Sequence, residues 1–304
     1  MNVREVPVEV RGKASALGDD GRRWLEGLDE LVARLEREWG VRVGATIRGG
    51  SESYVAEATT REGERAVLKL ALPGRDVSHE IATLRHAGGN GYVRLLRSDD
   101  ALQAMLQERL GAPLTAFALP FGAQLDVICA TLLRAWEVPP EPSFRSGADK
   151  AAWLSEFIAA TWHELGEPCP AAVIEHALAC AQSRLDAFDP ATAVLVHGDA
   201  HPANTLQHGA RFKLIDPDGL FAERACDLAV PMREHGRELL DAPDALTAAR
   251  DRCDYLARAC GVDARAIWEW GVMERVSTGL LALRTGRGRL GAEMLAVATA
   301  LARA

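Results

Sequence analysis

Residues 194–219 read VLVHGDAHPANTLQHGARFKLIDPDG. A short apolar run ends in His-Gly-Asp, an Asn follows five residues after that Asp, and a second Asp comes twelve residues after the Asn. Polar side chains directly behind buried hydrophobic residues are costly unless they are solvated, paired or used. The stretch is therefore either a polar loop with an accidental arrangement or a functional site.

The two apolar runs of this stretch, AVLV at 193–196 and FKLID at 212–216, are predicted to be strands. If they form a hairpin, the side chains of Asp199, Asn204 and Asp216 converge at one end. Carboxylate and amide oxygens are hard ligands that suit Mg²⁺. One carboxylate can instead act as a base toward a hydroxyl, and this division of roles matches the template of phosphoryl transfer.

A zinc site is the alternative interpretation of the same residues. His197, Asp199 and His201 form an H-x-D-x-H cluster of the kind that metal-dependent hydrolases use. That interpretation leaves Asn204 and Asp216 without a role, so the phosphoryl-transfer pattern is favoured. Asp227, in the apolar segment ACDLAV, is predicted to have a structural role in fixing the loop that contains Asp216.

The rest of the chain separates a β-rich part from a helical part. A helix is predicted over 20–39, then three strands, a short helix in DVSHEIATLRHAGG at 76–89 and two further strands. A Gly- and Pro-rich segment near residue 110 precedes a mostly helical region. This segregated order predicts an α+β fold in two lobes, residues 1–109 and 110–304.

Composition limits the classes of function. Hydrophobic residues make up 48% of the 304 residues, which is typical of a globular protein, and the net charge of -8 argues against a nucleic-acid binder. No apolar run reaches the roughly 20 residues of a membrane span, and the N-terminus does not resemble a secretory signal. The six cysteines form no C-x-x-C pair and are expected to be buried, reduced thiols. We therefore expect a cytoplasmic protein without a nucleic-acid or membrane partner.

The segments HGDAHPAN and LIDPDG resemble the catalytic and metal loops of the aminoglycoside phosphotransferase family, relatives of the protein kinases. The resemblance covers nearly the whole chain, and its ends look like the branch that contains the streptomycin 6-phosphotransferases. It implies a two-lobed kinase-like fold, with a nucleotide-binding N-terminal lobe and a C-terminal lobe for catalysis and the acceptor. Three features depart from protein kinases: Gly198 replaces their arginine, no G-x-G-x-x-G is present, and Pro217 replaces a phenylalanine.

The resemblance implies a role for each matching residue. Asp199 would be the base, Asn204 and Asp216 would bind Mg²⁺, and Lys69 in AVLKL would bind nucleotide phosphates with Glu80 of SHEIATLR as its partner. The phosphate-covering turn would include Gly49, Gly50 and Ser51. The segment that joins the lobes would receive the adenine through Gln107, Glu108 and Leu110.

The function implied is O-phosphorylation of an aminoglycoside-type antibiotic such as streptomycin, with ATP or GTP and Mg²⁺. Glu234, Glu269 and Glu274 are candidates for pairing with the ammonium or guanidinium groups of a cationic acceptor, although an acidic solvated face would explain them as well. A kinase of another small hydroxylated molecule and a catalytically silent nucleotide-binding module remain alternatives. The protein is expected to be a monomer or a homodimer.

Overall fold

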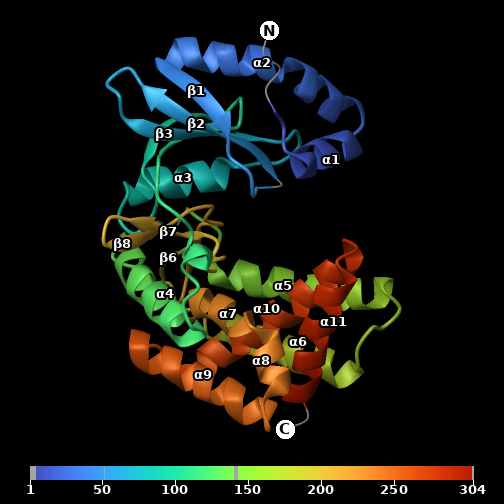
Figure 1. The fold of residues 1–304 in the computed structure, drawn as a ribbon. Helices are drawn as coiled ribbons and strands as arrows, with labels where there is room; N and C mark the ends of the chain where they lie inside the picture. The colour runs from blue at the N-terminus through green and yellow to red at the C-terminus, as the bar shows by residue number, and fades with distance from the viewer. Residues whose placement is uncertain (1–4, 51, 140–142, 303–304) are drawn as a thin grey trace. The chain divides into compact units, whose positions relative to one another are not determined.

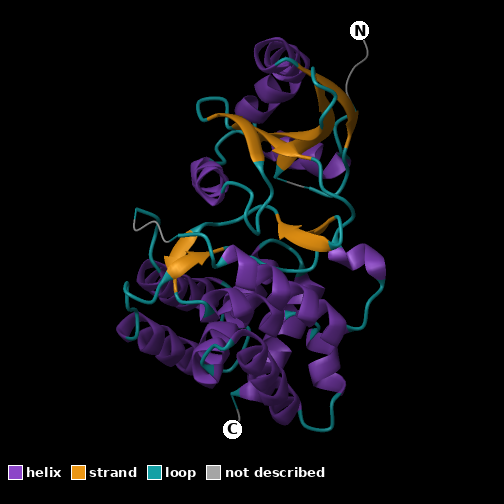
Figure 2. Cartoon of the chain, turned by 90° about the vertical axis from the view of Figure 1, so that its left-hand side faces the viewer, coloured by secondary structure: helices purple, strands orange, loops and turns teal. Residues whose placement is uncertain are grey.

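The computed structural model describes residues 5–50, 52–139 and 143–302. The chain divides into two compact units, which we call the N-terminal unit, residues 1–111, and the C-terminal unit, residues 112–304 (Figure 1). Figure 2 shows that the strands of the N-terminal unit belong to one sheet, whereas helices make up most of the C-terminal unit. The fold is mixed α+β, as the segregated order of elements predicts.

The N-terminal unit contains an antiparallel sheet of five strands in the order β1-β2-β3-β5-β4. These strands are β1 (Val41–Thr46), β2 (Ser53–Thr60), β3 (Arg65–Ala71), β4 (Leu95–Asp99) and β5 (Ala104–Glu108). β3 pairs with both β2 and β5, so Lys69 lies opposite Val55 on one side and Met105 on the other. Lys69 is thus on an interior strand of the sheet.

Three helices complete this unit: α1 (Val8–Ala16), α2 (Asp19–Trp39) and α3 (Ser78–Ala87). α2 packs an apolar stripe that includes Leu28, Val32 and Leu35 into the core of the sheet. The sequence did not predict α1. Its buried residues are Val10 and Ala14, which are too few to produce a recognisable helical period.

The C-terminal unit is built on helices. They are α4 (Phe121–Ala135), α5 (Gly147–Glu164), α6 (Ala171–Asp186), α7 (Ala225–Arg233), α8 (Gly236–Asp241), α9 (Ala245–Cys260), α10 (Ala264–Arg284) and α11 (Gly288–Leu301), with a 3₁₀ turn at Leu114–Phe117. α10 packs against α5, α6, α7, α9 and α11. Because α10 is surrounded in this way, its charged residues Glu269, Glu274 and Arg275 are buried.

Two short ladders hold the polar loops of the C-terminal unit. β6 (Val194–Val196) pairs with β9 (Leu220–Ala222), and β7 (Thr205–His208) pairs with β8 (Arg211–Leu214). The expected hairpin between the runs at 193–196 and 212–216 is therefore wrong. Each run has a nearer partner, because β7 and β8 need only a two-residue turn and β9 provides an apolar strand for the buried β6.

The described part of the chain contains no helix long and apolar enough to cross a membrane. All six cysteines are buried free thiols, as their sequence context predicts.

Candidate active site

Two loops of the C-terminal unit meet because one ladder is nested inside the other. The chain runs from β6 through residues 197–204 to β7, turns into β8, and returns through residues 215–219 to β9. Both loops therefore connect the outer ladder to the inner one and lie opposite each other. The Ile215 amide donates to the Asn204 carbonyl (3.0 Å), and His197 Nε2 lies 2.8 Å from the Ile215 carbonyl. This arrangement brings the segments of Asp199, Asn204 and Asp216 together without the predicted hairpin.

The backbone of the first loop is fixed by buried hydrogen bonds. Asp227 on α7 accepts from the amides of His197 (3.0 Å) and Gly198 (2.7 Å), and also from Trp136 Nε1 (2.8 Å). Asp227 thus holds the loop before Asp199, and the expectation that it fixes the loop of Asp216 is corrected. A carboxylate that accepts several N–H bonds in a buried site is a rigid anchor.

Gly198 is required by the shape of this loop. Its φ is +89°, and a Cβ at this position would lie 2.8 Å from the Cβ of Asp218. Both facts exclude the arginine that protein kinases carry at the corresponding point. The departure noticed in the sequence therefore has a local steric reason.

His197 does not offer a nitrogen to a metal ion. Its Nδ1 accepts from the Asp199 amide (3.1 Å), and its Nε2 is bonded to the Ile215 carbonyl. Both ring nitrogens are used to hold the two loops, and the side chain is fully buried. The zinc interpretation of His197 and His201 does not fit this geometry. In the described ranges, no group of three or more His, Cys, Asp or Glu side chains could hold a metal ion.

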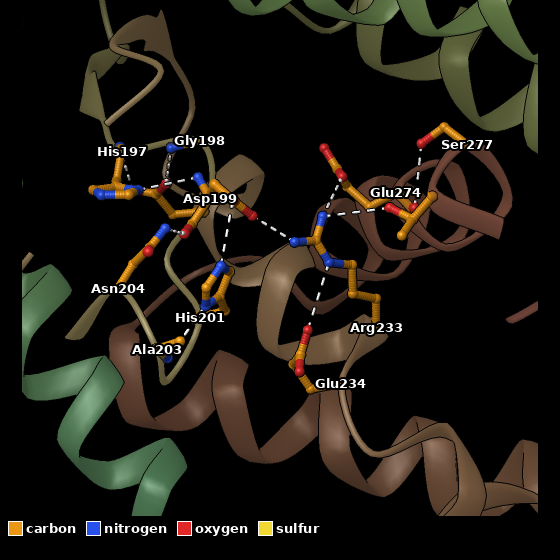
Figure 3. Close-up of polar contacts among 12 residues, drawn as sticks. His197, Gly198, Asp199, His201, Ala203, Asn204, Arg233, Glu234, Glu274 and Ser277 are labelled. Carbon is orange, nitrogen blue, oxygen red and sulfur yellow. Dashed lines mark hydrogen bonds and ion pairs between the residues drawn. The ribbon is translucent and has the colours of Figure 1, made fainter. Parts of the chain in front are cut away.

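Asp199 emerges from the fixed loop with its side chain 35% exposed. Arg233 Nη2 donates to Oδ1 (2.5 Å), and His201 Nε2 lies 3.5 Å from Oδ2 (Figure 3). Burial by itself would raise the pKa of the Asp199 carboxyl, but His201 and Arg233 outweigh it and hold the pKa below its usual range. The Asp199 carboxylate is thus ionised at neutral pH and can accept a hydrogen bond.

Asn204 and Asp216 supply oxygen atoms of the type that Mg²⁺ prefers. Asn204 Nδ2 donates to the Asp199 carbonyl (3.1 Å), so this bond uses the nitrogen of the amide and not its oxygen. Asp216 has a φ of +58°, a backbone conformation that a non-glycine residue adopts at some cost. These two side chains are of the types that bind a hard divalent cation, and their loops are joined by the bond from the Ile215 amide to the Asn204 carbonyl.

In the N-terminal unit, Lys69 and Glu80 form a buried pair. Lys69 Nζ lies 2.7 Å and 2.8 Å from the two oxygens of Glu80, and each side chain is 7% exposed. The pair joins the middle of the sheet to the first turn of α3. The structure thus unites two residues that the sequence analysis proposed as partners.

The other residues that were predicted to bind the nucleotide lie in three places. Gly49, with a φ of +123°, and Gly50 line a surface cavity together with Glu5–Glu9. Ser51 lies outside the described residues. Gln107 is buried on β5, and Glu108 ends this strand with its carboxylate accepting from the Arg94 amide (2.8 Å). Leu110 follows and is buried.

The three predicted acceptor residues have different surroundings. Glu269 is 8% exposed and pairs with Arg184 (2.6 Å) and Arg265 (2.8 Å). Glu274 is equally buried and pairs with Lys150 (2.7 Å) and Arg233 (3.0 Å). Glu234 is 31% exposed and lies 3.6 Å from Arg233 Nε. Neither Glu269 nor Glu274 belongs to an exposed acidic face.

Arg233 and Lys150 are the site residues that the sequence analysis missed. Arg233 lies between Asp199, Glu234 and Glu274 (Figure 3), and Lys150 Nζ contacts Glu274 and the Gly198 carbonyl (3.4 Å). A compositional signal was available for Lys150. The chain has only four lysines among 35 basic residues, and two of the four, Lys69 and Lys150, are buried against glutamates.

Known proteins resemble this chain at the level of family and of fold. The profile of the family described as aminoglycoside/hydroxyurea antibiotic resistance kinase matches residues 38–286. The streptomycin 6-kinase of Streptomyces griseus is 31% identical over 94% of this chain and 93% of its own length. The hydroxyurea phosphotransferase of Kitasatospora aureofaciens is 28% identical over 98% of this chain and 86% of its own.

Among solved structures, the choline kinase LicA from Streptococcus pneumoniae has a TM-score of 0.62 at 15% identity and covers 91% of this chain and 99% of its own. At this identity the likeness shows the fold, which is kinase-like as the sequence resemblance implies. The family resemblance is confirmed by the profile match and by the streptomycin 6-kinase relative. The chain therefore belongs to the family of aminoglycoside/hydroxyurea antibiotic resistance kinases and is an antibiotic-modifying phosphotransferase.

Proposed function

We propose that the chain transfers the γ-phosphoryl group of ATP, or of GTP, to a hydroxyl of an aminoglycoside such as streptomycin. The observation that carries the proposal is the loop pair of the C-terminal unit. It carries an ionised carboxylate, Asp199, and the oxygen-bearing side chains of Asn204 and Asp216 on two loops that are anchored by Asp227 and joined through Ile215. The streptomycin 6-kinase relative supports the choice of acceptor, because it is similar over nearly the whole chain.

Each residue has a task in this mechanism. Asp199 accepts a hydrogen bond from the acceptor hydroxyl, orients its oxygen toward the phosphorus and takes its proton late in the transfer, because a carboxylate with a lowered pKa is a weak base. Lys69, positioned by Glu80, binds phosphate oxygens of the nucleotide. Asn204 and Asp216 would hold Mg²⁺, which supplies neutralisation of phosphate charge when bound. Catalysis then rests on positioning and electrostatics.

A cationic acceptor is supported by charge. The chain carries a net charge of -8, and Glu234 presents a carboxylate that is 31% exposed next to the Asp199–Arg233 pair. We keep Glu234 as the residue that pairs with an acceptor cation. Glu269 and Glu274 already have two cationic partners each within the chain, so their role toward the acceptor has less support.

Hydroxyurea is the second candidate acceptor, because a hydroxyurea phosphotransferase is 28% identical over 98% of this chain. The purified protein should be incubated with ATP or GTP and with either streptomycin or hydroxyurea, and the products identified by mass spectrometry. We expect phosphorylated streptomycin, and we expect none with the Asp199→Asn control. Phosphorylated hydroxyurea alone would assign the second candidate, and nucleotide binding without any transfer would assign the silent module.

A further inference from the structure

Arg233 contacts the carboxylate that the proposed mechanism uses as its base. Its Nη2 donates to Asp199 Oδ1 (2.5 Å), and its Nη1 donates to Glu274 Oε2 (3.0 Å). The guanidinium is a planar fork, so two contacts made by its two ends fix its orientation. Oδ1 of Asp199 therefore accepts from Arg233, and Oδ2, which lies 3.5 Å from His201 Nε2, keeps the capacity to accept a further hydrogen bond, because a carboxylate oxygen has two lone pairs.

Glu274 and Lys150 fix the position of Arg233. Glu274 on α10 is 8% exposed, and its second oxygen contacts Lys150 Nζ (2.7 Å) on α5. Asp199, Arg233, Glu274 and Lys150 thus form a row of alternating charges drawn from the first loop, α7, α10 and α5. Buried charges of this kind are stable only when they are paired, so each member restrains the next.

The backbone that carries Arg233 is also restrained. Arg252 donates to the Glu234 carbonyl (2.6 Å), and Arg275 donates to the Met232 carbonyl (2.6 Å). These are carbonyls at the C-terminal end of α7, where the helix leaves its last acceptors unsatisfied. Cations at this position satisfy them and interact favourably with the helix dipole. The residues on both sides of Arg233 are therefore held by buried arginines.

We propose that Arg233 is a positioning residue for the phosphoryl transfer: it fixes the Asp199 carboxylate so that Oδ2 receives the acceptor hydroxyl, and Glu274 and Lys150 hold it in place. This inference rests on the proposed function, since it takes Asp199 as the base. It assigns roles to Arg233 and Lys150, which the sequence analysis did not single out, and a different role to Glu274. Arg233 acts through Asp199, to which it donates a hydrogen bond.

A double-mutant cycle tests this role. Arg233→Lys keeps the charge but loses the fork, and a misplaced catalytic group costs up to about a hundredfold in rate. We expect kcat to fall about tenfold to a hundredfold, with the nucleotide KM changed by less than about twofold. In an Asp199→Asn background the same substitution should change kcat by less than about twofold, because residues that act as a unit are not additive. Equal losses in both backgrounds would overturn the proposal.

Arg184→Lys is the matched control, because Arg184 is also a buried arginine paired with a glutamate of α10 and has no contact with Asp199. We expect a similar loss of thermal stability and an unchanged kcat. A crystal structure of Arg233→Lys gives a readout that needs no acceptor: the Asp199 carboxylate should rotate, and an unchanged orientation would overturn the proposal. A wild-type protein that phosphorylates no antibiotic would refute the proposed acceptor and leave this structural readout to decide the role of Arg233.

Discussion

A buried lysine–glutamate pair lies in each unit of the molecule, and the two pairs are almost equal in burial and in their shortest N–O distance. Lys69 and Glu80 are each 7% exposed and 2.7 Å apart, and Lys150 and Glu274 are 7% and 8% exposed and also 2.7 Å apart. Their connections differ. Lys69 contacts both oxygens of Glu80, whereas Glu274 gives one oxygen to Lys150 and the other to Arg233.

The two lysine–glutamate pairs thus position different groups. In the N-terminal unit the glutamate orients a lysine, and the lysine is the group that can meet a phosphate. In the C-terminal unit the lysine contacts a glutamate, which contacts an arginine, and the arginine contacts Asp199, the proposed base. The geometry of an ion pair alone thus does not indicate its function. The function depends on which further group the pair contacts. Substitutions in these two sets of contacts should therefore have different effects on catalysis and on nucleotide binding.

The largest effect is expected at Asp199, which ends the row of alternating charges in the C-terminal unit. Asp199→Asn removes the proton acceptor but keeps the size of the side chain. We expect kcat to fall at least about a hundredfold, since general acid–base catalysis contributes about 10²–10⁴. Nucleotide binding, measured by calorimetry, should stay within a few-fold, because Lys69 and Glu80 are intact. A variant that retains half of the wild-type kcat would remove Asp199 from the mechanism.

The next effect concerns the metal. Asp216→Ala removes a hard oxygen ligand, so we expect the Mg²⁺-dependent part of nucleotide affinity to be lost in titrations with and without Mg²⁺. After chelation of the wild type, Mg²⁺ or Mn²⁺ should restore activity and Zn²⁺ should not. Stoichiometric zinc bound by the purified protein through His197 and His201 would contradict this prediction and favour the hydrolase interpretation.

A third test compares the two glutamates directly. Glu80→Gln and Glu274→Gln keep the size of the side chain but remove its charge, so each leaves a buried cation without its full counter-charge and is expected to lose stability. We expect Glu80→Gln to raise the nucleotide KM about tenfold, since a weakened charge-assisted contact of about 1.4 kcal/mol corresponds to that factor. Glu274→Gln should lower kcat and leave the nucleotide KM nearly unchanged. Steady-state kinetics on both variants checks the split, and the same pattern in both would remove the distinction between the pairs.

The smallest effect is expected at Glu234, the partly exposed residue next to Arg233. Glu234→Gln should raise the KM for streptomycin a few-fold at low salt, and the difference should shrink as NaCl is added, because exposed charges are screened over about 8 Å at physiological ionic strength. The KM for hydroxyurea, a neutral molecule, should not respond to salt. Glu26→Gln, which removes an exposed carboxylate from α2, is the control. A streptomycin KM that ignores both salt and Glu234 would contradict a cationic acceptor at this position.

Several features could be predicted from the sequence because they depend on local order. The pair of Lys69 and Glu80 joins a strand to the next helix along the chain, and the two residues are eleven positions apart. The loops of Asp199 and Asp216 lie within one short polar stretch that folds back on itself. For the two loops, spacing and residue type were informative; the Lys69–Glu80 pair was an expectation from the family resemblance, and the short connection between β3 and α3 is the physical reason that the two residues can meet.

Only the tertiary structure decided the row from Asp199 to Lys150, because α5, α7 and α10 meet through helix packing and no sequence spacing encodes that contact. Glu269 and Glu274 illustrate the reason. They are five residues apart on one helix, a separation that turns their side chains to different faces at 3.6 residues per turn. One faces Arg184, and the other faces Lys150 and Arg233. The sequence determined that these residues are charged and helical, whereas the packing of the neighbouring helices determined which of them restrains the base.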